Sequence, residues 1–121
     1  SGSVHTGTGG SSAGFIGNAE MFDITITNSF SNSEITADAG SIGGLLGEGG
    51  IGYTLSNTNS FYQKDMASNI TVTRDDGTVA GQTANKTIAE LTTPATFSGA
   101  GWDMTTVWYD PVLNTTYPTL R

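Results

Sequence analysis

Cysteine is absent from this 121-residue chain, so neither a disulfide nor a thiolate metal site can form. Basic residues are scarce: four Lys and Arg stand against eleven Asp and Glu, a net charge of −7. So few cations cannot build a phosphate-binding patch, which excludes nucleic acid and disfavours an anionic membrane surface. No apolar run approaches the roughly 18 residues of a membrane-spanning helix. We therefore expect no nucleic-acid partner and no membrane insertion.

Charge is sparse altogether, since charged residues make up only 12% of the chain. Disordered chains combine low hydrophobicity with a high charge density, so this composition indicates a folded protein. The length suits a single domain over residues 1–121. The chain begins Ser-Gly-Ser without a signal-peptide pattern, and we interpret it as a piece of a longer protein.

What the chain has in abundance is glycine, 17 residues in all, and much of it falls in a repeat. Gly14-Phe-Ile-Gly17 returns thirty residues later as Gly44-Leu-Leu-Gly47. At an offset of 31, Thr27-Asn-Ser-Phe30 returns as Thr58-Asn-Ser-Phe61. A period of about thirty residues is typical of a solenoid, in which each unit buries its apolar face against its neighbours.

Within the repeats the residue types favour strands. Phe22-Asp-Ile-Thr-Ile-Thr27 alternates apolar and polar residues, the pattern of a strand with one buried face. We predict an all-β fold, a short parallel β-helix or β-solenoid of about two to three coils with an aromatic-rich C-terminal cap that contains a short helix. The expected divisions are the end of a preceding coil (1–12), a first repeat (13–42), a second repeat (43–70), and a hairpin with the cap (71–121).

The recurring Asn28 and Asn59 have two interpretations. Stacked asparagines can hydrogen-bond along a solenoid as an amide ladder, or each can form a local Asx-turn. The sequence does not distinguish them.

The repeat stops after residue 66. Residues 70–80 read as a hairpin whose tight turn is Asp76-Gly77. A short helix is expected next, with Thr87 as N-cap, Glu90 completing a capping box, and Pro94 ending it. The tail from Phe97 to Leu120 holds both tryptophans, and we expect it to close the exposed end of the repeats.

These motifs resemble a known family. Ala13-Gly-Phe-Ile-Gly17 and Gly43-Gly-Leu-Leu-Gly47 are similar to the GLUG motif of bacterial surface and secreted proteins, among them filamentous-haemagglutinin-like adhesins and the stalks of IgA-cleaving metallopeptidases. The closing segment follows the family's order, with Thr87-Ile-Ala-Glu-Leu91, Gly101-Trp-Asp103 and Tyr117-Pro-x-Leu120. Asn59-Ser-Phe-Tyr62 resembles the family's Asn-Ser/Cys-Tyr-Trp-Asp ending, except that Gln63-Lys64 replaces Trp-Asp. The resemblance implies a parallel β-helix in an extracellular bacterial protein, without catalytic residues.

The residues themselves offer no convincing catalytic set. The single histidine, His5, has no cysteine or nucleophile-elbow serine to act with, and we interpret it as a solvated residue. Glu34 with Asp38, and Asp75 with Asp76, are the nearest carboxylate pairs, but neither is placed convincingly for glycosidic acid–base chemistry. We expect the chain not to be an enzyme.

Two binding sites can be proposed from the sequence. Asp75 and Asp76 could hold calcium, although Asp-Gly is also the common hairpin turn. Trp108 and Tyr109 could stack on a glycan, although aromatic rings equally well build a small core. No other cofactor is expected.

The function expected is that of a structural and adhesive repeat module of an extracellular bacterial surface protein, stalk or filament. Its expected partners are neighbouring repeats of the parent chain, a second copy of itself, or a host glycan or surface receptor. Two alternatives stay open at this point. One is a carbohydrate- or receptor-binding module, and the other is the accessory stalk of a secreted enzyme.

Overall fold

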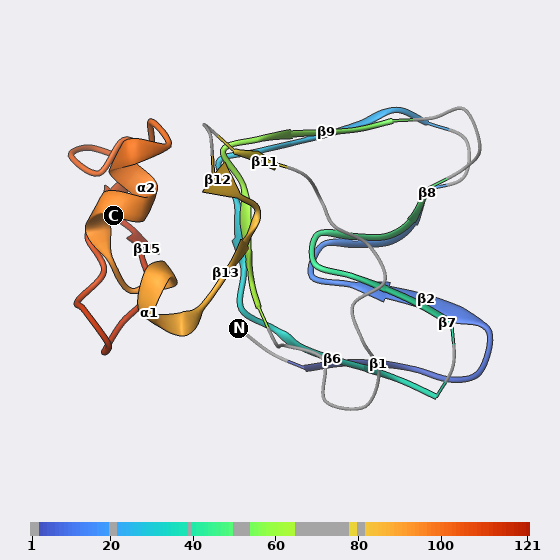
Figure 1. The fold of residues 1–121 in the computed structure, drawn as a ribbon. Coiled ribbons are helices and arrows are strands. Elements are labelled where there is room, and N and C mark those ends of the chain that lie inside the picture. The colour runs from blue at the N-terminus through green and yellow to red at the C-terminus, as the bar shows by residue number, and fades with distance from the viewer. Residues whose placement is uncertain (1–2, 20–21, 39, 50–53, 65–77, 80–81) are drawn as a thin grey trace.

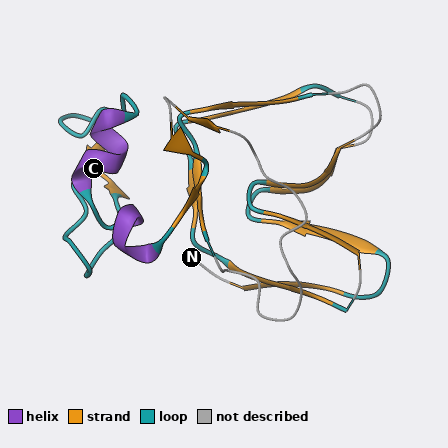
Figure 2. Ribbon diagram, in the orientation of Figure 1, coloured by secondary structure: helices purple, strands orange, loops and turns teal. Residues whose placement is uncertain are grey.

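The computed structural model describes residues 3–19, 22–38, 40–49, 54–64, 78–79 and 82–121 (Figure 1). Strands predominate in this part of the chain, where fifteen short strands accompany two short helices. Both helices lie in the C-terminal tail (Figure 2). The prediction of a mainly β protein is therefore confirmed.

Ten strands divide into two consecutive runs of five. The first run, residues 3–31, comprises β1 (Ser3–Thr6), β2 (Gly10–Ala13), β3 (Ile16–Ala19), β4 (Ile24–Thr27) and β5 (Phe30–Ser31). The second run, residues 34–63, comprises β6 (Glu34–Ala37), β7 (Gly40–Gly43), β8 (Leu46–Gly49), β9 (Leu55–Thr58) and β10 (Phe61–Gln63).

Each strand of the first run pairs in parallel with its counterpart in the second run. The facing residues are Ser3 and Glu34, Gly10 and Gly40, Ile16 and Leu46, Ile24 and Leu55, and Phe30 and Phe61. These separations are 30 residues at β2 and β3 and 31 at the other strands, as in the sequence repeat. The two runs follow the same course in Figure 1, one behind the other.

The repeat boundaries expected from the sequence divide this pattern at other points. Residues 1–12 were interpreted as the end of a preceding coil, and within them β1 and the start of β2 pair as the opening of the first run. A periodic sequence has no intrinsic starting residue, so units of 13–42 and 43–70 describe the same pairing from a different origin. Those divisions, and the 71–121 segment, stay predictions.

Glycines allow the chain to turn sharply between β7 and β8. A Cβ atom added to Gly43 would lie 1.7 Å from the carbonyl oxygen of Leu46, and one added to Gly44 would lie 2.1 Å from the ring of Tyr62. In the first run, a Cβ on Gly14 would lie 2.2 Å from the hydroxyl of Ser31. The glycines of the Gly-Gly-Leu-Leu-Gly motif thus lie at close contacts that leave no room for a side chain.

Asn28 and Asn59 share a backbone conformation that neither sequence interpretation considered. Their φ angles are 46° and 56°, in the left-handed region that asparagine adopts more readily than most residues. Each stands just before the Ser-Phe pair that leads into β5 or β10. The recurrence of asparagine is explained by this left-handed corner in both runs.

After the second run the strand pairing changes. β11 (Thr78–Val79) and β12 (Gln82–Thr83) pair antiparallel, and β13 (Asn85–Lys86) then pairs in parallel with β10. The turn predicted at Asp76-Gly77 lies outside the described residues. Among the described residues, the partner of β11 is the strand that follows it.

The tail contains the expected helix and a second, unexpected one. α1 (Ile88–Leu91) has Thr87 as its N-cap and Glu90 in a complete capping box, which confirms that prediction. Pro94 was expected to be a terminator, but it starts α2 (Pro94–Gly99). Proline suits the first turn of a helix because the N–H it lacks would have had no intrahelical partner there.

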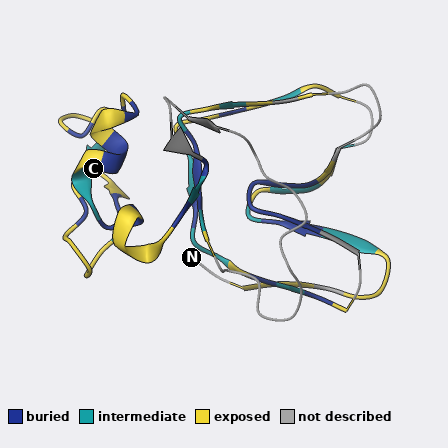
Figure 3. Cartoon of the chain, in the orientation of Figure 1, coloured by how far each residue is buried: buried dark blue, intermediate teal, exposed yellow. Residues whose placement is uncertain are grey.

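β14 (Trp108–Tyr109) and β15 (Thr119–Leu120) form a short antiparallel pair near the C-terminus. Together with the helices they lie beside β13 in Figure 1. In Figure 3 the tail is exposed along its outer loops and buried where α2 turns inward. The hydrophobic core therefore extends from the strand runs into the tail, and Phe97 and Trp102 are among its buried members.

Candidate functional site

The junction between the strand runs and the tail is a cluster of aromatic rings. Phe30 and Phe61 face each other in register on β5 and β10, so their side chains lie on the same side of this strand pair. Phe97 contacts both, with ring centroids 6.1 Å from Phe30 and 5.7 Å from Phe61. Trp102 also reaches both, at 6.3 and 6.4 Å. The tail therefore packs along the side of the two runs and contacts each of them.

Two polar contacts fix this junction. The indole Nε1 of Trp102 donates to the backbone carbonyl of Asn59 at 2.6 Å. The hydroxyl of Tyr117 donates to Oε1 of Gln63 at 2.9 Å. Both bonds join the tail to the second run, so the buried Trp102 and the partly buried Tyr117 have their polar atoms satisfied.

The two aromatic residues proposed as glycan contacts lie in different surroundings. Trp108 is half-buried, and its ring centroid is 4.7 Å from that of Trp102. Tyr109 is 52% exposed, and the guanidinium of Arg121 lies 4.4 Å from its ring centroid. Trp108 thus belongs to the aromatic junction. The glycan contact stays a prediction, and Tyr109 with Arg121 is the part of it that solvent can reach.

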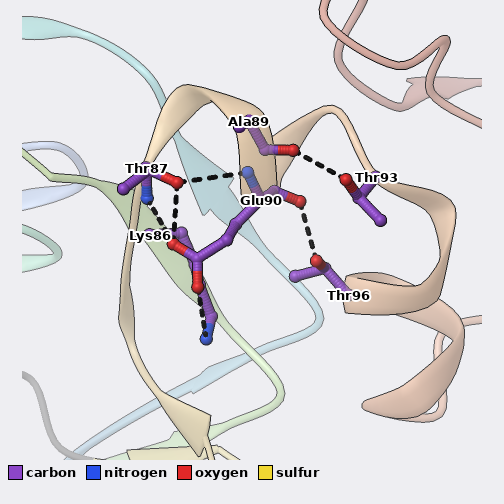
Figure 4. A network of polar contacts seen from close by, with 6 residues as sticks. All are labelled: Lys86, Thr87, Ala89, Glu90, Thr93 and Thr96. Atoms are coloured by element: carbon purple, nitrogen blue, oxygen red, sulfur yellow. Dashed lines mark hydrogen bonds and ion pairs between the residues drawn. The ribbon is translucent and has the colours of Figure 1, made fainter.

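A polar network surrounds the start of α1 (Figure 4). The backbone N–H of Thr87 donates to Glu90 Oε2 at 2.8 Å, and the Glu90 backbone N–H donates to Thr87 Oγ1 at 3.2 Å. The ammonium of Lys86 lies 3.8 Å from Glu90 Oε1, and also 5.6 Å from the ring centroid of Phe61. Lys86 is almost fully buried, so this charge depends on Glu90 and the aromatic face for compensation.

This network lowers the pKa of Glu90 below its ordinary value. The hydrogen bond from the Thr87 backbone is the main cause, and the Thr87 hydroxyl and the positive charge of Lys86 act in the same direction. These interactions favour the carboxylate over the protonated acid. They hold Glu90 ionised near its buried partner.

The lowered pKa of Glu90 predicts a loss of stability in acid. Because the folded pKa is depressed, this contribution is fully present above the unfolded value of about 4.5 and disappears as the pH falls through the folded value. We measure the free energy of unfolding with urea at pH 6 and at pH 3. We expect it to fall less between these two pH values in Glu90→Gln than in the wild type. Glutamine can keep the capping geometry but does not titrate. An identical pH dependence in the two proteins would contradict the assignment.

Asp103 organises the loop between α2 and β14. Its carboxylate accepts hydrogen bonds from the backbone N–H groups of Thr105 and Thr106, at 2.9 and 2.8 Å, and from both of their hydroxyls. These donors, the Thr106 hydroxyl first, hold the pKa of Asp103 well below its usual range. The carboxylate is exposed, and its role is explained by the turn that it stabilises.

His5 has neighbours that the sequence did not reveal. Its Nδ1 is hydrogen-bonded to Thr36 Oγ1 at 2.8 Å, and its Nε2 lies 3.7 Å from Asp38 Oδ1. Both contacts cross from β1 to the second run, because His5 faces Thr36 in the parallel pair. The His5 and Asp38 side chains are 60% and 58% exposed. We interpret this set as a surface contact between the runs.

The proposed calcium residues, Asp75 and Asp76, lie outside the described residues, and that site stays a prediction. The described part of the chain holds no group of three or more His, Cys, Asp or Glu side chains that could bind a metal ion. Within the same residues, neither helix has the length and apolar character required to cross a membrane.

The outer edge of the first run, where the sequence predicts that Val4 to Ser12 could accept the strands of a neighbour, carries exposed apolar side chains. Val4, Phe15 and Phe22 are large apolar residues of this run, and all three are exposed. The positions of Val4 and Phe15 recur as Ile35 and Leu45, which are fully buried. Comparing exposure between equivalent positions therefore identifies which run is uncovered.

Comparison with known proteins adds no assignment: no family model, curated protein or solved structure matches this chain. The resemblance to GLUG repeats stays a prediction that depends on the motifs themselves.

Proposed function

We propose that this chain is a non-catalytic structural and adhesive repeat module of an extracellular bacterial surface protein. In this proposal the two strand runs are successive coils of a short parallel β-helix, the aromatic tail covers both coils from the side, and β13 caps the second coil at β10. Neighbouring repeats of the parent protein are the partners of the module, and a host glycan or receptor is the external one.

The observation that carries the proposal is the strand register. Five successive parallel pairs join residues 30 or 31 positions apart, in the order in which they occur along the chain. Such pairing brings each run onto the next along one axis, which is how a solenoid extends without a larger core. A unit of this kind serves as a spacer, and its low content of charged and titratable side chains suits a structural role better than a catalytic one.

The glycine contacts support the same proposal. Gly14, Gly17, Gly43, Gly44 and Gly47 each have a neighbouring atom less than 3.0 Å from the place a Cβ would occupy. For Gly17 that atom is the backbone oxygen of Ser11, on β2. For Gly47 two backbone oxygens are this close, that of Ser12 on β2 and that of Gly17, the equivalent glycine of the first run. The motif that resembles GLUG repeats is therefore required by contacts within and between the runs.

Cross-linking tests this arrangement directly. Thr25 on β4 faces Ser56 on β9, and both residues are exposed. The chain has no cysteine, so the double variant Thr25→Cys with Ser56→Cys carries only the introduced pair. We expect it to form an intramolecular disulfide under mild oxidation, because facing Cα atoms on neighbouring strands are about 5 Å apart and within bridging range.

The matched control pairs Thr25→Cys with Thr58→Cys, two residues further along β9. This shift places the Cα atoms about 8 Å apart, beyond the reach of a disulfide. Equal cross-linking of the two variants, or none in the facing pair, would refute the register and with it the proposed stack. The product is measured by mass spectrometry after protein digestion.

A further inference from the structure

The first run is more exposed than the second at equivalent positions. Val4 is 37% exposed, whereas Ile35, which faces it in register, is fully buried. Phe15 is 48% exposed, whereas Leu45, its equivalent thirty residues later, is fully buried. The residue types are alike, so the difference comes from what covers each run.

The backbone of the first run is also open on one side. In the described part of the chain, each of β1–β5 has a strand partner on one side only, the corresponding strand of the second run. An open strand edge presents a row of N–H and C=O groups that can pair with a further strand. Within the described residues β6–β9 of the second run also have one strand partner each, so it is the exposed apolar side chains, together with an open edge at all five strands, that single out the first run.

We propose that this edge binds a further layer of parallel strands with the same thirty-residue pattern. The inference rests on the proposed function, since it continues the contact already made between the two runs. An occupant with a different fold could cover Val4 and Phe15 but could not pair with the edges of five strands around the cross-section. A repeat in register satisfies both requirements at once.

The occupant is an uncapped repeat and not the far end of a second copy of this chain. At that end β13 pairs with the outer side of β10, in the strand order β13-β10-β5. A second copy approaching with its second run would therefore offer no free edge at the fifth strand position. A repeat that is not followed by such a tail has all five edges free.

A tandem variant of the whole chain tests this inference. A copy of residues 3–33 is inserted directly before Ser3, so that every residue of the added copy lies 31 positions before its equivalent. We expect backbone amides of the original β1–β5 to exchange with solvent at least about tenfold more slowly than in the parent chain, measured by hydrogen exchange with NMR detection. The thermal midpoint is expected to rise as well.

The control carries the same insertion with Ala13→Asp and Ile26→Asp in the added copy only, because these two positions are buried even in the outermost run. These charges cannot be buried in a new layer, so the protection of β1–β5 should return to the parent level. Unchanged exchange of β1–β5 in the tandem variant would overturn the inference. If the parent chain instead assembled with itself as its concentration rose, and this protected the same amides, the occupant would be a second copy of the chain. That result would overturn the proposal of an uncapped repeat.

The same experiment separates this inference from the proposed function. If β6–β10 are unprotected even in the parent chain, the stacked arrangement itself fails. If β6–β10 are protected and only the added layer fails to protect β1–β5, the stack stands and the docking edge does not.

Discussion

Replacing Gly43 with alanine is expected to lower the free energy of unfolding by at least about 3 kcal/mol. The added Cβ would lie 1.7 Å from the carbonyl oxygen of Leu46, and 2.4 Å from its carbonyl carbon. Both atoms belong to the backbone, so no side-chain rotation relieves the overlap. The turn between β7 and β8 must open, and this displaces Leu45 and Leu46, which are buried in the second run.

The measurement is urea unfolding followed by circular dichroism, with Gly7→Ala as the matched control. A Cβ on Gly7 would have no heavy atom nearer than 3.9 Å, so the control should change the free energy of unfolding by less than about 1 kcal/mol. If the two variants were equally stable, the close contact at Gly43 would not exist in solution.

Replacing Phe97 with alanine is expected to cost about 4 kcal/mol, within the range for removing a large buried aromatic side chain. Phe97 is fully buried and contacts Phe30, Phe61 and Trp102, the last at a centroid distance of 4.9 Å. Its loss leaves a cavity where the tail meets both runs. The tail should then unfold at a lower urea concentration than the strands.

Phe22→Ala is the control for this prediction, because it removes the same side chain from a site that is 74% exposed. Its effect should be within about 0.5 kcal/mol. Tryptophan fluorescence reports the tail, which holds both Trp residues, and circular dichroism reports the strands. A Phe97→Ala protein as stable as Phe22→Ala would contradict the burial of this ring at the junction.

The Glu90 network shows how far local sequence reasoning extends. Thr87 and Glu90 could be identified as a capping box because their contacts span only three residues and depend on backbone geometry that any short helix shares. Lys86 could not be identified as buried. Its position depends on β13 pairing with β10 and on the ring of Phe61, which is 25 residues earlier in the chain.

Trp108 and Tyr109 show the same division between sequence and packing at the candidate site. The sequence proposes both as glycan contacts, and it predicts Tyr109 to be the more exposed because Tyr109 stands beside Asp110-Pro111. Successive side chains of a strand point to opposite sides, so the pairing of β14 with β15 directs Trp108 toward Trp102 and leaves Tyr109 beside Arg121. The exposure of Tyr109 could thus be predicted, whereas the contacts of Trp108 with Trp102 and Phe30 depend on how the tail packs against the strand runs.

The sequence by itself determined the strand content and the pairing register, including the change of offset from 30 to 31. It could do so because parallel runs repeat the same contacts, and similar residues therefore recur at each facing position. Only the tertiary structure decided where the tail packs and which aromatic residues are buried. Those features arise from contacts between segments that do not resemble each other in sequence, so the sequence repeat cannot predict them.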